Sequence, residues 1–303
     1  MVNLEDIFIA WINRKKEENI KQSSLANYYN IFYKYISPYI KVLLANNIKD
    51  YLNIITSKNI KSKTQYDIIT VVNNFFMFAY REKYINLYIH IKHAKIEQDE
   101  VETFTDNEVK KIDYSICNDP DYIKVEIILS LYTGIRIGEL CALTWTNIDL
   151  ESKIIKIRYT LQRIKNIDNN INSKTCIVID TPKTKKSLRN IPIPNFLIPL
   201  LNKFKSENNC YLLTGKTKYM EPRTMQKHFK KFLDTLNIKN KNFHCLRHTF
   251  ATNAYFNGMS IMTLSDILGH MSEEFTKKRY VHSNILLKQE EMNSIYNSKS
   301  FYA

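Results

Sequence analysis

The stretch Thr133–Leu140, which reads Thr-Gly-Ile-Arg-Ile-Gly-Glu-Leu, decides how the rest of this chain is interpreted. The apolar residues before it keep helical spacing, and Gly134 is the residue type that commonly ends a helix. Arg136 then begins a second helix, and Glu139 lies three positions later on the same helical face. The stretch therefore predicts two helices that meet at a glycine turn, with an arginine and a glutamate held side by side.

Two later segments also place basic residues where the local structure would fix the positions of their side chains. Residues 181–186 form a basic turn between two expected strands, and Lys183 in this turn follows a proline. His244, Arg247 and His248 stand at i, i+3 and i+4, so all three project from one face of a helix. Of these three, we expect His248 to serve in packing rather than in catalysis.

A fourth segment joins a histidine to a helix end. His270 follows a glycine that stops a helix, and Tyr280 comes ten residues later. Each segment is weak evidence alone, because the chain has 20 tyrosines and an arginine in a short helix is usually an ion-pair residue. Together, and in this order, the segments resemble the tyrosine recombinases of the phage integrase family. The signature of that family is an Arg, a Lys on a β-hairpin, a His-x-x-Arg, a Gly-His and a nucleophilic Tyr.

The resemblance implies a role for each residue that matches the signature. It covers residues 104–303 at the level of motifs, and residues 1–85 only in length and helical pattern. Glu139 matches the acidic residue that supports the first arginine, either as its ion-pair partner or with a direct role. The implied catalytic residues are Arg136, Lys183, His244, Arg247, His270 and the nucleophile Tyr280.

Cleavage of a DNA phosphodiester by a tyrosine explains why these residue types belong together. In-line attack spreads negative charge over the non-bridging oxygens, and the planar guanidinium groups of two arginines match that charge. His270 can add a hydrogen bond to the same phosphate. His244 is a suitable acceptor for the tyrosine proton, whose pKa is about 10, and Lys183 can protonate the leaving 5′-oxygen. The covalent 3′-phosphotyrosine keeps the bond energy, so the resemblance implies neither a cofactor nor a metal.

The composition agrees with a DNA partner. The chain of 303 residues carries 44 Lys and Arg against 30 Asp and Glu, a formal net charge of +14. These basic residues are spread along the chain, which favours nucleic acid over a membrane surface. The five cysteines lie far apart, without a Cys-x-x-Cys pair, as expected of reduced thiols in a cytoplasmic protein. We expect no membrane span, because no apolar run of about 18 residues occurs.

Hydrophobic periodicity predicts two domains of different kinds. Residues 4–84 keep helical spacing and predict a bundle of about four helices, with Ser24 as the cap of one of them. We expect a helical core-type DNA-binding domain at 1–85, a linker at 86–103 and a catalytic domain at 104–303.

The second domain is predicted to be mixed. Thr105 and Glu108 form a capping-box pattern, and Asp119 with Pro120 is the expected start of a further helix. Three β-branched segments predict a small antiparallel sheet, and helical spacing returns from residue 195 onward. The strand segments are 154–159, 176–179 and 189–193, with 165–174 as a hairpin tip. The predicted fold class is therefore mainly α with a small antiparallel β-sheet.

These features predict a metal-independent, site-specific DNA recombinase that works as a homotetramer on double-stranded DNA, with an excisionase or a DNA-bending protein as open accessory partners. The chain begins at the helical bundle, as Xer-type enzymes do, whereas residues 161–185 resemble the hairpin of conjugative-transposon integrases. We favour integration or excision of a mobile element. The alternatives are Xer-like chromosome-dimer resolution, a type IB topoisomerase and a catalytically idle DNA-binding protein. Residues 284–297 predict an amphipathic helix that docks either on a neighbouring subunit or on its own domain.

Overall fold

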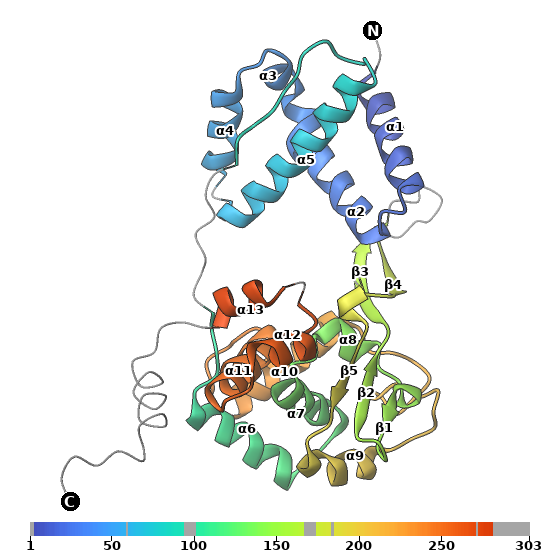
Figure 1. Cartoon of the computed structure of the whole chain (residues 1–303), viewed down its shortest axis with the longest axis vertical. Coiled ribbons are helices and arrows are strands. Elements are labelled where there is room, and N and C mark those ends of the chain that lie inside the picture. Colours follow the sequence, from blue (N-terminus) through green and yellow to red (C-terminus); the bar gives the residue numbers. More distant parts are fainter. Residues whose placement is uncertain are drawn as a thin grey trace, which may run out of the picture. The chain divides into compact units, whose positions relative to one another are not determined.

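The chain divides into two compact units (Figure 1). The structure is a computed structural model that describes residues 3–58, 60–93, 101–166, 174–182, 185–270 and 272–280; the side chains at 185 and 278–280 are outside that description. The first unit comprises Met1–Asp99 with Ile164–Cys176, and the second comprises Glu100–Arg163 with Ile177–Ala303. The domain boundaries drawn from the sequence stay a prediction. The predicted fold class is confirmed, since helices dominate and one small sheet is antiparallel.

Helices build the first unit. They are α1 (Leu4–Glu17), α2 (Gln22–Ile31), α3 (Ile40–Leu44), α4 (Ile48–Ser57) and α5 (Ser62–Arg81). A π-helical turn and a 3-10 turn connect α2 to α3, and α3 itself is little more than one turn. The expected cap at Ser24 is wrong, because α2 already begins at Gln22 behind Lys21.

Aromatic rings fill the centre of this unit. Phe8 and Phe32 stack with their centroids 3.8 Å apart, and Phe75 meets Phe32 edge-on at 5.4 Å. The segment after α5 also belongs to this core, because the buried Asn73 amide donates to the carbonyl of Ile91 at 2.9 Å and accepts from its N–H at 2.8 Å. Both groups of this amide are thus satisfied inside the bundle, as burial requires.

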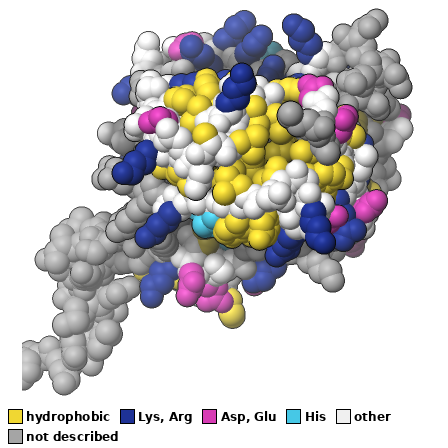
Figure 2. Space-filling model, turned by 90° about the horizontal axis from the view of Figure 1, so that it is seen from above, with side chains coloured by type: hydrophobic (Ala, Val, Ile, Leu, Met, Phe, Trp, Pro, Cys, Tyr) yellow, Lys and Arg dark blue, Asp and Glu magenta, His cyan; other side chains and the backbone are white. Residues whose placement is uncertain are grey.

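One face of the first unit is apolar. Figure 2 shows a broad hydrophobic area on it, bordered by Lys and Arg side chains. Exposed aromatic residues of this unit include Tyr80 and Tyr88, whose rings lie 5.5 Å apart, and Tyr84. Large exposed apolar areas of this kind are typical of surfaces that contact other macromolecules.

Eight helices of the second unit lie within the described residues. They are α6 (Asp106–Asn118), α7 (Tyr122–Thr133), α8 (Ile137–Cys141), α9 (Ile198–Phe204), α10 (Pro222–Thr235), α11 (His244–Phe256), α12 (Ile261–Leu268) and α13 (Glu273–Tyr280). No helix in this described part of the chain, or in that of the first unit, is long and apolar enough to cross a bilayer.

The sequence predicts caps for the first two helices of this unit, α6 and α7. The capping box of Thr105 and Glu108 is confirmed at the start of α6. The expected cap at Asp119 is wrong, because Asp121 caps α7 by accepting from the N–H of Lys124 at 2.8 Å. Asp119 instead binds the Lys124 ammonium at 2.7 Å. Both aspartates have a side chain that can cap a helix, so the residue at which α7 begins, rather than residue type, determines which of them is the cap.

The strands form two separate sheets. β1 (Ile148–Asp149), β2 (Ile154–Ile157) and β5 (Arg189–Pro192) make an antiparallel sheet in which Ile155 pairs with Ile191. β3 (Thr160–Lys165) pairs with β4 (Thr175–Asp180) in a two-stranded sheet. The expectation that residues 176–179 join the other two strands in one sheet is therefore wrong, because β4 follows its hairpin neighbour instead. Residues 167–173 of the predicted hairpin tip lie outside the described part.

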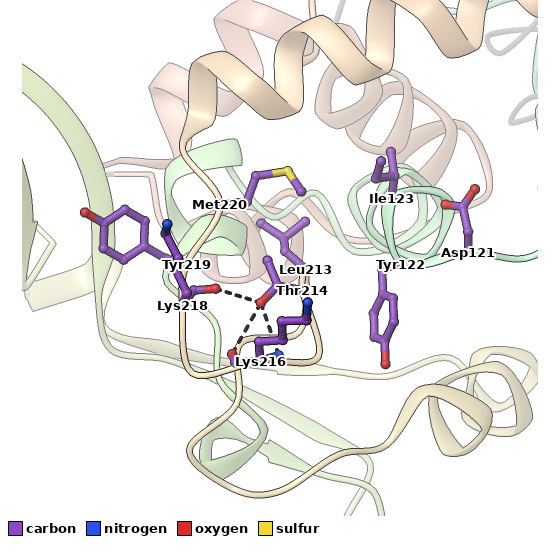
Figure 3. A pocket seen from close by; sticks show the side chains of 9 residues that line it. All are labelled: Asp121, Tyr122, Ile123, Leu213, Thr214, Lys216, Lys218, Tyr219 and Met220. Carbon is purple, nitrogen blue, oxygen red and sulfur yellow. Dashed lines mark hydrogen bonds between the residues drawn. The ribbon is translucent and has the colours of Figure 1, made fainter.

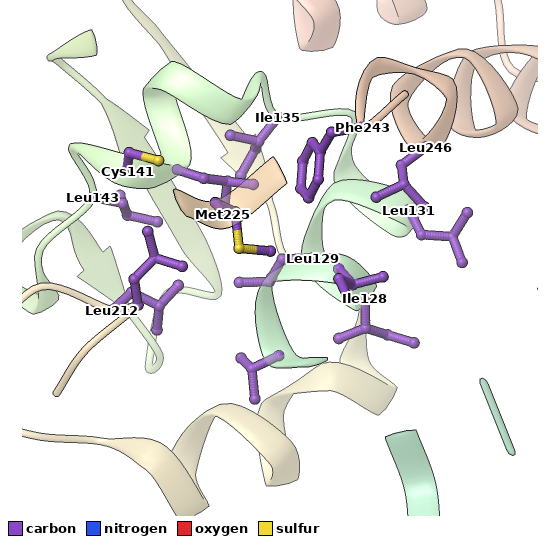
Figure 4. Packing of buried hydrophobic residues seen from close by; sticks show 14 of the residues in the cluster. Ile128, Leu129, Leu131, Ile135, Cys141, Leu143, Leu212, Met225, Phe243 and Leu246 are labelled. Atoms are coloured by element: carbon purple, nitrogen blue, oxygen red, sulfur yellow. The ribbon is translucent and has the colours of Figure 1, made fainter. Parts of the chain in front are cut away.

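Helix α7 runs through the core of the second unit. Its residues from Val125 to Leu131 are all buried, which fits a helix enclosed on every side. Figure 4 shows Leu129 among side chains from other elements, including Met225 of α10 and Leu246 of α11. Because α7 and α11 pack together in this way, the end of α7 is fixed beside the start of α11.

Glu126 is an unusual member of this core helix. It is completely buried, and neither carboxyl oxygen has a hydrogen-bond partner among the described residues. Burial raises the pKa of Glu126 well above its ordinary value of 4.5. Burial thus favours the neutral form of Glu126 in the folded chain, and this preference lowers the stability of the fold as the pH rises above 4.5, where the unfolded chain ionises freely.

Replacing Glu126 by Met is therefore expected to stabilise the chain. At pH 7, the free energy of unfolding should rise by about 1–3 kcal/mol, because a carboxyl without partners leaves the core. Denaturant titrations measure this gain, which should shrink as the pH falls toward 4.5. Glu151→Met, at an exposed position, is the control and should change stability by less than about 0.5 kcal/mol. A loss of stability on Glu126→Met would show that the carboxyl has a stabilising partner.

Candidate active site

The turn between α7 and α8 places Arg136 and Glu139 in contact. Gly134 ends α7 with a left-handed φ of 66°, and a Cβ there would lie 2.6 Å from the Phe250 ring, so only glycine fits. Arg136 is then the N-cap of α8. Its N–H donates to Glu139 Oε2 at 3.0 Å, and its Nη1 donates to Oε1 at 2.8 Å. The predicted contact between these two side chains is confirmed.

A second arginine, which the sequence pattern placed only in a strand, completes the surroundings of Glu139. Arg189 Nη1 and Nη2 donate to Oε1 and Oε2 of Glu139, each at 2.8 Å. Only 3% of the Glu139 side chain and 5% of the Arg189 side chain are exposed. Burial alone would raise the pKa of Glu139. The hydrogen bond and charge of Arg189, with the charges of Arg136 and Arg247, outweigh it and lower this pKa to about 2.

The sequence did carry a signal for Arg189. Along β5, Arg189 and Ile191 are buried whereas the residues after each are exposed, so the arginine stands on the apolar face of its strand. A charged residue at such a position is almost never buried without a partner. The partner, Glu139, lies 50 residues away, and no local pattern identifies it.

Arg247 occupies the meeting point of two helix ends. Its side chain is 1% exposed, and it donates to the carbonyl of Gly134 at 2.6 Å and to that of Leu268 at 2.7 Å. Both carbonyls stand where a left-handed glycine, Gly134 or Gly269, ends a helix. The last carbonyls of a helix have no partner within it and carry partial negative charge, so they suit a guanidinium.

His270 links Arg247 to helix α13. Its Nε2 lies 3.0 Å from Arg247 Nη2, and its Nδ1 lies 2.8 Å from Oγ1 of the buried Thr276. A guanidinium has only donors, so in this contact Nε2 accepts. The remaining proton of a neutral ring then sits on Nδ1, which donates to Thr276. Arg136 also contacts the backbone of the turn before His270, because its Nη2 donates to the carbonyl of Gly269 at 3.2 Å.

His244 and His248 lie on α11 beside this network. His244 is the first residue of the helix and is exposed, whereas His248 is buried. Their rings are perpendicular, with centroids 4.6 Å apart. The burial of His248 agrees with the packing role expected for it, and its neighbour on the helix, Cys245, is buried as well.

The structure thus brings four of the predicted residues, Arg136, Glu139, Arg247 and His270, into one network and places His244 at the start of α11. Lys183 and residues 284–297 lie outside the described residues. Tyr280 is the last residue of α13, and its side chain lies outside the description.

The network has a surplus of positive charge. Among the described residues it contains the guanidinium groups of Arg136, Arg189 and Arg247 and the carboxylate of Glu139, which sum to two positive charges. A hollow of about 230 Å³ opens beside it and is lined in part by Lys186, Arg189 and His270. A partly buried surplus of this kind attracts an anion.

A larger hollow lies elsewhere on the second unit. Figure 3 shows this pocket of about 540 Å³ between the start of α7 and the loop before α10. Its walls include Tyr122, Leu213 and Met220, and Lys216 and Lys218 also line it. None of the predicted catalytic residues is part of its lining. Size alone therefore does not mark the reactive centre of this chain.

Comparison with known proteins agrees with the sequence motifs. Residues 102–286 match the Phage integrase family. A "Tyrosine recombinase XerC-like" protein of Caldanaerobacter subterraneus subsp. tengcongensis is 28% identical, over 93% of this chain and 79% of the relative. The ICEBs1 integrase of Bacillus subtilis is 24% identical, over 86% of this chain and 74% of its own.

Solved structures share the fold. The Tn1549 transposon integrase in complex with circular intermediate DNA superposes with a TM-score of 0.70 at 20% identity, covering 95% of this chain and 99% of that chain. The lambda integrase tetramer bound to a Holliday junction gives a TM-score of 0.62 at 19% identity, covering 91% and 77%. At these identities the likeness shows the arrangement of elements.

The low pKa of Glu139 makes stability depend on pH. A carboxylate with a lowered folded pKa stabilises the chain fully above its ordinary value of 4.5, and this contribution is lost as the pH falls toward 2. At pH 7, Glu139→Gln is expected to cost about 3–5 kcal/mol, because buried arginines lose their counter-charge. The stability difference from wild type, measured by denaturant titration, should narrow from pH 4.5 downward. The charged groups that act on Glu139 are Arg189, Arg136 and Arg247. Lys156 and Arg158 line the same small hollow as Glu139.

Glu221→Gln is the matched control for this titration. Glu221 also binds an arginine through both oxygens, at 3.0 and 2.6 Å from Arg163, but about 30% of its side chain is exposed. Exposed pairs contribute little, so the loss there should stay below about 1 kcal/mol. An equal loss in both variants at every pH would contradict the burial of the Glu139 pair.

Proposed function

The chain belongs to the phage integrase family, and we propose that it is the recombinase of a mobile element, which it integrates or excises through a covalent 3′-phosphotyrosine intermediate. Tyrosine recombinases break and rejoin DNA strands. The observation that carries the proposed mechanism is the convergence of Arg136, Arg247 and His270 with a surplus of positive charge. The scissile phosphate is the anion that this surplus binds.

The two arginines divide the work on the phosphate. Arg247 is fixed by two helix-end carbonyls, so its planar group is oriented before DNA arrives. Arg136 is 32% exposed and offers its outer edge to a phosphate oxygen. As the phosphorus becomes five-coordinate, the equatorial oxygens gain negative charge, and the positive charges of Arg136 and Arg247 stabilise that state more than the ground state.

Helix α13 supports the assignment of Tyr280 as nucleophile. Thr276 holds the helix to His270, and position 280 is four residues further along the same helix. Residues four apart share a face of a helix, so position 280 falls on the face that meets the network. The exposed His244 accepts the tyrosine proton, and Lys183 gives a proton to the departing 5′-oxygen.

Two related recombination tasks agree with the relatives of this chain. Relatives include a "Tyrosine recombinase XerC-like" protein and the ICEBs1 integrase, and the Tn1549 transposon integrase shares the fold. The second candidate is therefore Xer-like resolution of chromosome dimers. In both cases the substrate is double-stranded DNA at specific sites, and four copies assemble on it. The apolar face of the first unit offers a surface for contacts in that assembly.

The nucleophile is tested by Tyr280→Phe on a nicked suicide substrate. The variant is expected to bind DNA as the wild type does and to form no covalent protein–DNA adduct, because only the phenolic oxygen is lost. Denaturing gels detect the adduct. Tyr114→Phe, at an exposed position on α6, is the control and should form normal amounts. A normal adduct from Tyr280→Phe would move the role to another residue.

The general acid is tested by changing the leaving group. Lys183→Ala should cleave ordinary DNA far more slowly than wild type, but a substrate with sulfur in place of the bridging 5′-oxygen at near the wild-type rate, because a thiolate leaves without a proton. Lys185→Ala, in the same basic turn, should cleave both substrates normally. If the thio substrate rescues Lys185→Ala instead, the acid is Lys185.

A further inference from the structure

We propose that Arg189 is a positioning residue of the strand-cleavage reaction, which aligns Arg136 through Glu139 and ties the Gly269–His270 turn to the strand that follows the basic turn. The proposal rests on the proposed function of the site. Arg189 lies outside the set of residues that the family signature names, yet it contacts three of the segments that build the site.

The first contact is with the cap of α8. Both oxygens of Glu139 are shared between two arginines, since Oε1 accepts from Arg136 and Arg189 and Oε2 accepts from the Arg136 N–H and Arg189. The carboxylate can hold Arg136 in one place only if it is itself held in one place. The planar fork of Arg189 provides this, because a bidentate pair fixes both distance and orientation.

The second contact is with the end of α12. Arg189 Nε donates to the carbonyl of Ile267, three residues before His270. The chain approaches so closely here that a Cβ on Gly269 would lie 3.0 Å from Arg189 Cδ and 3.2 Å from the Lys186 carbonyl. The left-handed turn that delivers His270 is thus packed directly on the stem of the Arg189 side chain.

The third contact is with the segment that follows the basic turn. Arg189 Nη1 also donates to the carbonyl of Ser187 at 3.2 Å, and Arg189 is the first residue of β5. One buried guanidinium therefore connects the α8 cap, the α12 end and the residues that follow Lys183. Loss of the fork should disturb the mutual alignment of the reacting groups more than the binding of DNA.

The experiment compares Arg189→Gln and Arg189→Lys with wild type in single-turnover cleavage at saturating DNA. Displacements of about 1 Å can cost about 100-fold in rate, so we expect a loss of this order in both variants, with DNA affinity within a few-fold of wild type. Lys keeps the charge but not the fork, and its failure to rescue would point to geometry. Arg163→Gln is the matched control, because it breaks another bidentate pair with a glutamate and should cleave normally.

A double-variant cycle separates alignment from general damage. If Arg189 acts mainly through Glu139, Arg189→Gln should slow cleavage much less in a Glu139→Gln background than in wild type. An equal slowing in both backgrounds, or cleavage by Arg189→Gln within about threefold of wild type, would overturn the proposal. Thermal melting identifies variants that have lost their fold, and free guanidinium ion should restore part of the rate of a folded Arg189→Ala variant.

A measurement without DNA tests the role of Arg189 independently of the proposed recombinase activity. Carboxyl carbon NMR follows the ionisation of Glu139, whose pKa should rise in Arg189→Gln and stay low in Arg163→Gln. If wild type forms no adduct on any suicide substrate, the proposed function fails, and this titration still decides whether Arg189 holds Glu139. An unchanged Glu139 pKa would contradict that hold even in an active enzyme.

Discussion

The architecture of the site depends on one buried charge. Arg247 is almost completely buried, and a guanidinium removed from water must find acceptors for its donors or the fold pays a large penalty. Two helices solve this by ending at the same point, where Gly134 and Gly269 turn the chain left-handed and leave carbonyls facing the charge. The same turns deliver Arg136, two residues after Gly134, and His270, directly after Gly269. The need to solvate one arginine therefore fixes the positions of its neighbours.

Charge balance then explains why the network is suited to a phosphate. Glu139 neutralises one of three guanidinium groups, and its own pKa falls because those groups surround it. The three guanidinium groups and one carboxylate of the described network sum to two positive charges, and a bound anion would lower the electrostatic cost of holding them together. Sites that stabilise the charge of a transition state hold like charges in a fixed orientation, and this arrangement lowers the stability of the folded protein. The fully buried Glu126 has no such partner among the described residues, and burial raises its pKa well above 4.5, so the surroundings of these two acids shift their pKa values in opposite directions.

Sequence reasoning succeeded where a local rule fixes the structure. Glycine stops, the capping box at Thr105 and the contact between Arg136 and Glu139, three residues apart, each depend on neighbours within four residues, and all are present. It failed where two nearby residues satisfy the same rule, as Asp119 and Asp121, two positions apart, do at the start of α7. It also failed where a strand had to choose its partner, because β4 pairs with β3 rather than with β2 and β5. These choices depend on packing across long separations, which periodicity does not record.

Arg189 shows why the site itself was only partly visible in the sequence. The alternation Arg189, Ile191 marks a charged residue on an apolar face, and that contradiction indicates a buried partner, but the partner can be any acid in the chain. The family signature cannot help, since it names groups by their chemistry toward the substrate, whereas Arg189 touches only other protein groups among the described residues. A residue whose work is to hold other residues becomes recognisable only when its hydrogen bonds are seen together. The bonds to Glu139 and Ile267 span 50 and 78 residues of sequence, and that separation makes Arg189 a constraint on the tertiary fold rather than on any single element.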